Sequence, residues 1–267
     1  MTQTKIFIRG LSFNVMSDSP HGNQIWSDIS NGVWEPQTFR ILENILTQND
    51  CALELGIDLG QTSLFTAAKV GKFLAVEPSK TSIAFAKELF KLNPDLLKKS
   101  LLVHGALSNS REKVLFGRGS KFFDQIHFIG ENHDIYVDAY LIEDLQKKVG
   151  ERITFINMDI EGGEYICLSN MYTWLRENQP KLLLSLHPGF LLTPNQKEKS
   201  LLWRYINRVF EQRKIFKSIW FYPYIYDAVT LKRISPFSIF RLKYIRSKSA
   251  HNSQILCMKY RINQTFN

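Results

Sequence analysis

Two carboxylates and a glycine turn stand close together in CALELGIDLGQTSLFTAAKVGKFLAVEP, residues 51–78. Glu54 ends one apolar run and Glu77 ends the next. Gly56 and Gly60 lie between them, and glycine allows a tight turn that brings the backbone against a ligand. A carboxylate can pair with an ammonium group or accept hydrogen bonds from a ribose diol. These residues therefore indicate a site for a small molecule that carries both groups.

The order of these residues favours S-adenosylmethionine as that molecule. Glu54 suits its ammonium group, Glu77 suits its ribose, and a helix that begins near Thr62 offers backbone N–H groups to its carboxylate. A dinucleotide is disfavoured, because its G-x-G-x-x-G turn needs glycine where this chain has Asp58, whose charge would repel a pyrophosphate. A third interpretation is a turn that binds no ligand and only joins a strand to a helix.

Short apolar runs alternate with longer amphipathic segments along the chain. The apolar runs predict buried strands: LEL, FLAVE, LLVHGAL, ITFINMD, KLLLSLHP and IWFYPYIY. The amphipathic segments predict helices: residues 61–70, 80–92, 163–178 and 195–212. This alternation predicts an α/β fold with a doubly wound, mostly parallel Rossmann-like sheet covered on both faces. Two further strands, EKVLF and IYVDAY, are expected within residues 111–149. The final SQILCMKYRI is expected to close the sheet as an antiparallel strand beside IWFYPYIY.

Ligands of an open parallel sheet bind beyond the carboxyl ends of its strands, where the strand order reverses. Glu54 and Glu77 end strands separated by one helix, so we expect them to be neighbours. Polar residues also stand at the ends of later predicted strands. Asp159 ends ITFINMD and is followed by Glu161, and His187 ends KLLLSLH. The ordinary pKa of a histidine suits a general base near neutral pH.

Structural roles compete with these chemical ones. Glu161 and Glu164 both suit the positive end of a helix dipole, and for Glu164 we favour that role alone. A lone histidine is more often a satisfied structural residue than a base. Asp159 and Glu161 together resemble part of a magnesium site, but no further spaced ligands accompany them, so no metal is predicted. Glu35 lies either over the bound ligand or on the surface, and both interpretations stay open.

The pattern E-x-G-x-D-x-G at residues 54–60 is similar to the first motif of class I S-adenosylmethionine-dependent methyltransferases. More narrowly, residues 53–79 resemble the FkbM family of O-methyltransferases, whose members typically read D-x-G-A-N-x-G and later E-P. Glu54 stands where that family usually has Asp, and Ile57-Asp58 where it has Ala-Asn. The resemblance covers about residues 33–188. Its further stretches are VWEPQTF, GALSN, VDAYLIEDL, INMDIEGGE and LSLHP.

This resemblance implies a fold of the class I methyltransferase type, a donor site and a reaction. The positions expected to contact S-adenosylmethionine are Glu54, Gly56, Asp58, Gly60, Glu77, Ala106 and Leu107. The resemblance places Asp159 against the methyl end of the donor and the acceptor hydroxyl, and with Glu161 and His187 it forms the expected catalytic set. The implied reaction is methyl transfer to a hydroxyl, expected on a sugar, a glycan or a glycosylated metabolite.

The net charge of +9 is concentrated near the end of the chain. From residue 201 onward, thirteen Lys and Arg residues face only two acidic ones, so this part carries +11 and the rest −2. Its stretch LKRISPFSIFRLKYIRSKS suits a solvated insertion, which we favour, or a lid over an anionic acceptor, a peripheral membrane contact or a nucleic-acid surface. An RNA methyltransferase and a non-catalytic donor-binding module that binds a partner are therefore the alternative functions.

The expected organisation is an N-terminal cap segment over residues 1–49 and a methyltransferase domain over 50–267, with the basic insertion at about 227–252. No apolar run approaches the roughly 18–20 residues that span a bilayer, and no signal-peptide core is present near the start. The odd and scattered cysteines, Cys51, Cys167 and Cys257, fit neither a disulfide framework nor a zinc site, so a cytoplasmic location is expected.

Overall fold

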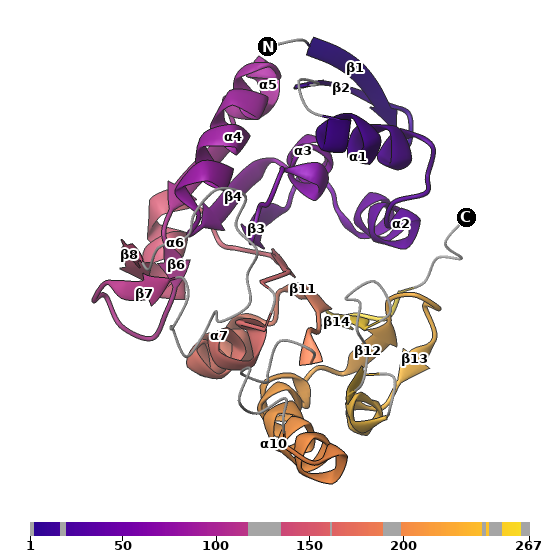
Figure 1. The fold of residues 1–267 in the computed structure, drawn as a ribbon, viewed down its shortest axis with the longest axis vertical. Coiled ribbons are helices and arrows are strands. Elements are labelled where there is room, and N and C mark those ends of the chain that lie inside the picture. Colours follow the sequence, from indigo (N-terminus) through magenta and orange to yellow (C-terminus); the bar gives the residue numbers. More distant parts are fainter. Residues whose placement is uncertain are drawn as a thin grey trace.

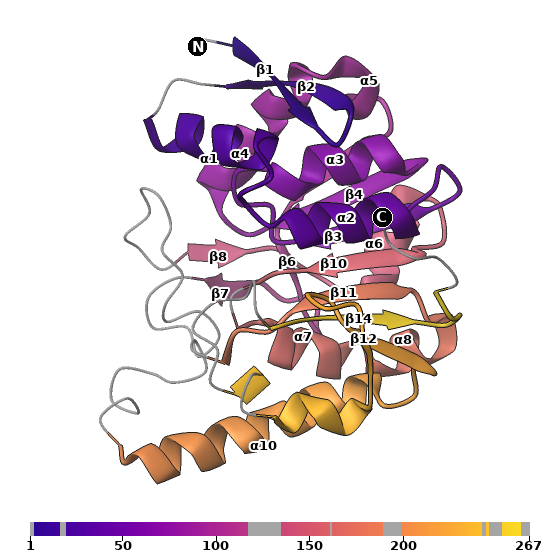
Figure 2. The same cartoon turned by 90° about the vertical axis from the view of Figure 1, so that its right-hand side faces the viewer.

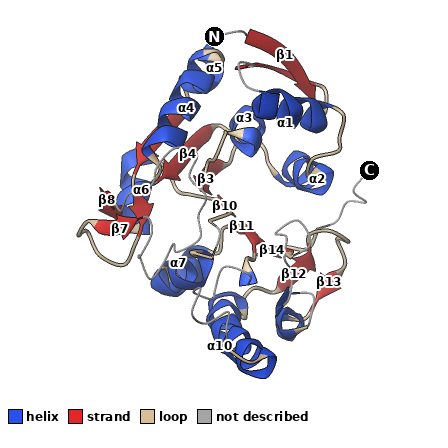
Figure 3. Cartoon of the chain, in the orientation of Figure 1, coloured by secondary structure: helices blue, strands red, loops and turns tan. Residues whose placement is uncertain are grey.

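The computed structural model describes residues 3–16, 20–116, 135–160, 162–188, 199–241, 244–245 and 253–262. A sheet of eight strands runs through its centre (Figure 1 and Figure 3), in the order β13-β12-β14-β11-β10-β3-β4-β5. The strands are β3 (Cys51–Leu55), β4 (Lys72–Glu77), β5 (Ser100–His104), β10 (Phe155–Met158), β11 (Lys181–Ser185), β12 (Tyr224–Asp227), β13 (Arg233–Ile234) and β14 (Gln254–Met258).

The strands from β11 to β5 pair in parallel, whereas β14 runs antiparallel to both of its neighbours, β11 and β12. The short β13 pairs antiparallel with β12 at the edge. The predicted α/β fold, with a mostly parallel sheet and an antiparallel closing strand, is therefore confirmed. The strand order reverses between β3 and β10, because the chain leaves β3 toward β4 and leaves β10 toward β11.

Helices cover both faces of this sheet, as Figure 2 shows. One side carries α1 (Pro20–Ser30), α2 (Pro36–Ile45), α3 (Gln61–Lys69), α4 (Lys80–Lys91) and α5 (Pro94–Leu97). The other side carries α6 (Ile142–Val149), α7 (Glu164–Asn170), α8 (Tyr172–Asn178) and α10 (Leu201–Ile219). Alternate residues of one strand fill two separate cores: Phe73 stacks on Phe90 of α4, while Leu74 packs in the core that includes Leu168 of α7. A sheet covered in this way explains why its strands are continuously apolar.

The N-terminal segment contains a hairpin that the sequence analysis did not resolve. Strands β1 (Gln3–Ile8) and β2 (Leu11–Met16) pair antiparallel around Arg9 and Gly10, whose φ angles are +45° and +83°. Two positive φ angles in a two-residue turn are typical of tight hairpins. The alternation in TKIFI and SFNV carried this signal. The hairpin packs in the same core as α3 and α4, and the boundary at residue 49 stays a prediction.

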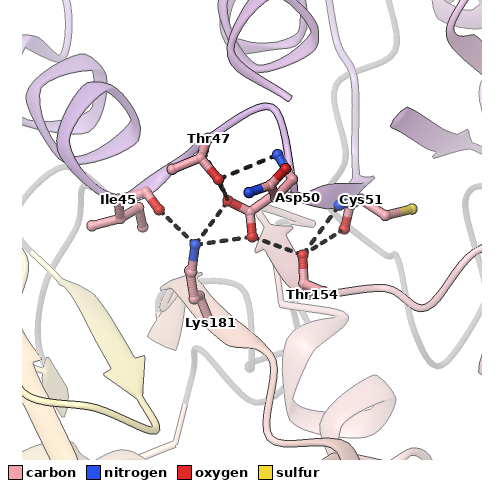
Figure 4. A network of polar contacts seen from close by, with 7 residues as sticks. Ile45, Thr47, Asp50, Cys51, Thr154 and Lys181 are labelled. Carbon is pink, nitrogen blue, oxygen red and sulfur yellow. Dashed lines mark hydrogen bonds and ion pairs between the residues drawn. The ribbon is translucent and has the colours of Figure 1, made fainter. Parts of the chain in front are cut away.

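An ion pair between a buried carboxylate and a partly buried ammonium group connects elements at the amino end of the sheet (Figure 4). The Asp50 carboxylate, directly before β3, lies 2.8 and 2.9 Å from Nζ of Lys181, the first residue of β11. It also accepts hydrogen bonds from the Thr47 backbone N–H at 2.8 Å and from the Thr154 hydroxyl at 2.8 Å. Lys181 Nζ in turn donates to the carbonyl of Ile45, the last residue of α2. The network thus joins α2, β3, β11 and the approach to β10.

Some predicted element boundaries need correction. The strand predicted over IWFYPYIY is wrong in its first half, because α10 continues to Ile219 and β12 begins only at Tyr224. Ile215 and Ile219 are both buried, so the helical period persists into that stretch. The helix predicted over residues 163–178 is two helices, α7 and α8, that meet at Met171.

Short strands flank the main sheet. Of the two extra strands expected within residues 111–149, EKVLF contains β7 (Val114–Phe116), whereas IYVDAY contains two short strands, β8 (Ile135–Val137) and β9 (Ala139–Tyr140). Strand β7 pairs with β8, and β9 pairs with β6 (Ala106–Leu107), which precedes that range. Residues 242–243 and 246–252 of the predicted basic insertion lie outside the described residues. No helix in the described part of the chain is long and apolar enough to cross a membrane.

Candidate active site

Glu54 is buried at the point where the strand order reverses. It pairs in register with Asn157 of β10, whose Nδ2 donates to Glu54 Oε1 at 3.1 Å, and the Thr62 hydroxyl donates to the same oxygen. Oε2 is also buried and forms no well-aligned hydrogen bond in the part of the chain that the structure describes, although the nearby Ser63 hydroxyl acts to lower the pKa of this carboxyl. Burial raises the pKa of Glu54 to about 7, with a smaller contribution from the charge of Asp159. Neither Asn157 nor Thr62 was expected to hold Glu54.

Glu77 fastens the glycine turn that follows Glu54. Its Oε2 accepts a hydrogen bond from the backbone N–H of Ile57 at 2.9 Å, and its Oε1 accepts one from the N–H of Ser79 at 2.7 Å. Burial raises the pKa of this carboxyl as well, although these amides oppose the shift. Each oxygen of a carboxylate has two lone pairs, so Glu77 can still accept hydrogen bonds from a ligand.

The glycine turn has a backbone that other residues could not readily adopt. Gly56 has a φ of +86°, and a Cβ atom there would lie 2.2 Å from the carbonyl oxygen of Asp159. Gly60 has a φ of +79° and precedes α3 as its N-cap. Asp58 also has a positive φ, +50°, and its exposed carboxylate accepts a hydrogen bond from Gln61 at 2.9 Å. The turn thus places backbone that has no side chain against the loop after β10, and α3 begins directly after the turn.

Ala106 and Leu107 lie beyond the end of β5, next to Glu77. The preceding residue, Gly105, donates its N–H to the Glu77 carbonyl at 3.0 Å, which joins the two strand ends. Both residues are buried in the short β6, where the Ala106 N–H donates to the carbonyl of Asp138 at 2.9 Å. The structure therefore gathers all seven predicted donor-contacting residues around the carboxyl ends of β3, β4 and β5.

His187 lies between two carboxylates. Its Nε2 is 3.2 Å from Asp159 Oδ1, and its Nδ1 is 3.3 Å from Glu164 Oε1. The backbone N–H of His187 also donates to Glu164 Oε1 at 2.7 Å, and Glu164 Oε2 accepts from the N–H of Gly162 at 2.7 Å. Glu164 does stand in the first turn of α7, as expected, but it is fully buried and anchors the histidine. No sequence signal indicated that contact.

Asp159 is more exposed than His187 or Glu164: about a third of its side chain, 36%, is accessible to solvent. Burial among protein atoms raises its pKa, the charge of His187 opposes the shift, and the charges of Glu35 and Glu164 add to it. The third predicted catalytic residue, Glu161, lies outside the described residues, so its role stays a prediction. The fold brings Asp159 and His187 together as neighbours. They are 28 positions apart in the sequence, and each follows the end of a different strand.

A buried polar chain connects the N-terminal segment to the closing strand beside Asp159. The Thr38 hydroxyl of α2 lies 2.8 Å from Glu35 Oε2 and 3.2 Å from Gln254 Oε1 of β14. Gln254 then donates to the Ser185 hydroxyl at 3.1 Å, and Ser185 hydrogen bonds to Asp159. Glu35 is buried, so the interpretation that placed it on the surface is wrong.

Acidic side chains dominate the edge of the sheet that these residues form. We call this set the acidic edge: Glu35, Glu54, Glu77, Asp159 and Glu164. So many carboxylates in one partly buried place favour a cationic ligand. Within the described ranges, no group of three or more His, Cys, Asp or Glu residues is arranged to hold a metal ion. A carboxylate oxygen of this site could bind a cation, and the His187–Asp159 pair could accept a proton.

Comparison with known proteins places this site in a family. Residues 50–193, more than half of the chain, match the model of the methyltransferase FkbM domain. No curated protein matches. Solved structures that this chain matches include methyltransferase FkbM from Methylobacillus flagellatus KT, with a TM-score of 0.40 and 16% identity over 55% of this chain and 34% of that one. Another is the CcbJ methyltransferase from Streptomyces caelestis, with a TM-score of 0.31 and 12% identity over 56% and 50%. The chain thus spans about a third of the first structure and half of the second.

Proposed function

The chain belongs to the FkbM methyltransferase family, and from this premise we propose that it transfers the methyl group of S-adenosylmethionine to a hydroxyl. The acceptor we propose is a sugar, a glycan or a glycosylated metabolite. The observation that carries the donor assignment is the buried Glu54 Oε2, which forms no well-aligned hydrogen bond within the described ranges, although the nearby Ser63 hydroxyl favours the ionised carboxylate. A buried carboxylate oxygen without a partner is unfavourable unless a ligand supplies a donor.

The acidic edge complements the charge of this donor. S-adenosylmethionine has a sulfonium and an ammonium group against one carboxylate, so it is a net cation. Glu54 would pair with the ammonium group, and the remaining lone pairs of Glu77 would accept hydrogen bonds from the ribose hydroxyls. The N–H groups at the start of α3 would receive the carboxylate. When bound, the donor supplies an electrophilic methyl group.

Asp159, His187 and Glu164 supply the proton-accepting side of the proposed reaction. Asp159 is the member that solvent reaches, so an acceptor hydroxyl meets its carboxylate first. His187, held from behind by Glu164, shares the proton that Asp159 takes. The raised pKa of Asp159 suits this task, because a base accepts a proton best when its pKa approaches the working pH.

A titration and a kinetic comparison test this proposal. Calorimetry of the purified protein with S-adenosylmethionine and with S-adenosylhomocysteine is expected to detect binding of both. Exchange of His187→Gln is expected to lower kcat on a hydroxyl acceptor by about 10²–10⁴-fold while the donor Kd stays unchanged. An unchanged kcat would remove His187 from the mechanism. Absence of any donor binding by folded protein would overturn the donor assignment itself.

The acceptor class needs its own experiment. Formation of S-adenosylhomocysteine is measured with a panel of neutral sugars, anionic glycans and RNA, with and without a chelator. We expect turnover with a sugar hydroxyl and no turnover with RNA. The chelator should leave the rate of turnover unchanged. Methylated RNA would instead assign the protein to the alternative function. Donor binding without turnover on any acceptor would favour a non-catalytic binding module.

A further inference from the structure

The outward face of α10 changes from apolar to basic along its length. Leu202, Ile206 and Phe210 follow one another at intervals of four residues, so their side chains form one stripe. They are 68%, 45% and 54% exposed. Arg213 and Lys217 continue the same face by helical spacing and are exposed as well. We call these five residues the α10 face.

The opposite side of the helix holds it on the protein. Ile215 and Ile219 are fully buried in the core beneath the sheet, and Gln212 donates to the carbonyls of Ile239 and Tyr244 at 3.0 and 3.2 Å. Figure 2 shows α10 as the outermost layer, at the end of the molecule away from the β1–β2 hairpin. The α10 face therefore has no part in fastening the helix, and its apolar residues need another explanation.

Aromatic side chains extend this surface at its basic end. Phe237, in the 3-10 helix η2 (Pro236–Phe240), is 69% exposed, and its ring centroid lies 4.9 Å from that of Phe216 on α10. Trp220, directly after the helix, is 53% exposed. The helix has five basic residues and only one acidic residue, Glu211, which pairs with Lys214. Exposed aromatic and basic side chains thus lie together at this end of the surface, with the Arg213 guanidinium over the Phe210 ring.

We propose that the α10 face docks on an anionic lipid surface. Leu202, Ile206 and Phe210 would enter the boundary between headgroups and acyl chains, as apolar faces of interfacial helices do. Arg213 and Lys217 would stay level with the anionic headgroups, since long basic side chains reach back toward water. The segregation of the two kinds of residue along one face matches the two layers of such a surface.

The charge of the helix disfavours the other occupants. A symmetric contact with a second copy of the chain, centred on Leu202, Ile206 and Phe210, would bury the apolar residues but would offer Arg213 and Lys217 no anionic partner from this face. A nucleic acid would meet two aliphatic side chains, Leu202 and Ile206, that offer neither stacking nor a hydrogen bond. An anionic lipid surface offers acyl chains to the apolar residues of the α10 face and negative charge to its basic residues.

Vesicle flotation of the full chain tests the proposal. Vesicles of phosphatidylcholine with phosphatidylglycerol are expected to bind the protein, and vesicles of phosphatidylcholine alone are expected to bind it weakly. Phe210→Ser is expected to lower the partition coefficient by about tenfold or more, and Lys217→Gln by roughly fivefold. The matched controls are Phe7→Ser on β1, where the side chain is 60% exposed, and Lys87→Gln on the exposed side of α4; neither should change binding.

Several outcomes would overturn the proposal. These are failure of the wild type to bind anionic vesicles, equal binding by Phe210→Ser and Phe7→Ser, and equal binding to both kinds of vesicle. Sedimentation equilibrium without lipid gives a further check, because a dimer abolished by Phe210→Ser would assign the face to a second copy. Donor titration of the same variants keeps the outcome separate from the proposed function, since the α10 face contains no donor-contacting residue.

Discussion

Asp50 and Glu54 are buried carboxylates at opposite ends of strand β3, and the fold surrounds them differently. Both oxygens of Asp50 accept hydrogen bonds, and the Lys181 ammonium lies against both (Figure 4). Glu54 receives two hydrogen bonds on one oxygen, and its other oxygen has no well-aligned hydrogen bond from the residues that the structure describes, although the Ser63 hydroxyl lies nearby. The carboxylate at the amino end of the strand has a cationic partner in Lys181, whereas Glu54 has no cationic partner among the described residues.

The two pKa values express this difference. Burial alone would raise both, because it disfavours a charged carboxylate. For Asp50, the hydrogen bonds from Lys181 and Thr154 and the charge of Lys181 outweigh burial, so its pKa lies below the usual value. For Glu54, burial prevails and the pKa is about 7. A carboxylate satisfied by its own protein contributes to the fold, and one left unsatisfied is available to a ligand.

The largest expected effect is on stability at the amino end. Asp50→Ala leaves the Lys181 cation without its partner, and we expect the free energy of unfolding to fall by about 4 kcal/mol. Urea denaturation at neutral pH measures this change, and calorimetry should give an unchanged donor affinity. Asp95→Ala is the control, because its pair with Lys98 is exposed and should matter little. A loss no larger than that of the control would contradict the structural role of Asp50.

Glu54→Gln is expected to change stability in the opposite direction. The folded pKa of Glu54 lies above the ordinary value of 4.5 for a glutamate, so ionisation opposes folding as the pH rises from 4.5 to about 7. Removing the charge should therefore raise the free energy of unfolding by about 3 kcal/mol at pH 8 and change it little at pH 4. Denaturation curves at both pH values test the sign. Donor affinity should fall, by about 100-fold, since the ammonium group loses its counter-ion.

The smallest of the three effects is the pH dependence of donor binding. Below pH 7 an increasing fraction of Glu54 is protonated and cannot pair with an ammonium group. Donor affinity of the wild type should fall by about tenfold per pH unit there. Calorimetry in buffers of different ionisation enthalpy should detect proton release on binding. The Glu54→Gln variant should lose this slope, whereas a slope that persists would assign it to another group.

The sequence was sufficient for the fold and for the strand ends because both depend on local pattern. Apolar runs with helical segments between them require the layered sheet, and the last residue of a buried run lies at its edge wherever the strand pairs. Glu54, Glu77, Asp159 and His187 could therefore be placed along one edge from their positions in the chain. Their partners could not.

Partners depend on register and on contacts between distant elements. Asn157 meets Glu54 because β3 and β10 pair at that register, and nothing in the sequence of either strand fixes it. Glu164 reaches His187 because the start of α7 lies against the turn after β11. The aromatic stretch before Pro223 favoured a strand by composition, but the buried Ile215 and Ile219 carry the helix to the start of that stretch, and a turn follows before β12.

The position of β14 has a consequence for how this protein can be made. It is the last strand along the described chain, yet it lies inside the sheet, between β11 and β12, and its Gln254 joins the polar chain beside Asp159. During synthesis, the edges of β11 and β12 that pair with β14 therefore stay unpaired until the ribosome has released β14. A premature stop before Gln254 would remove a strand from the interior of the sheet and leave a gap beside Asp159.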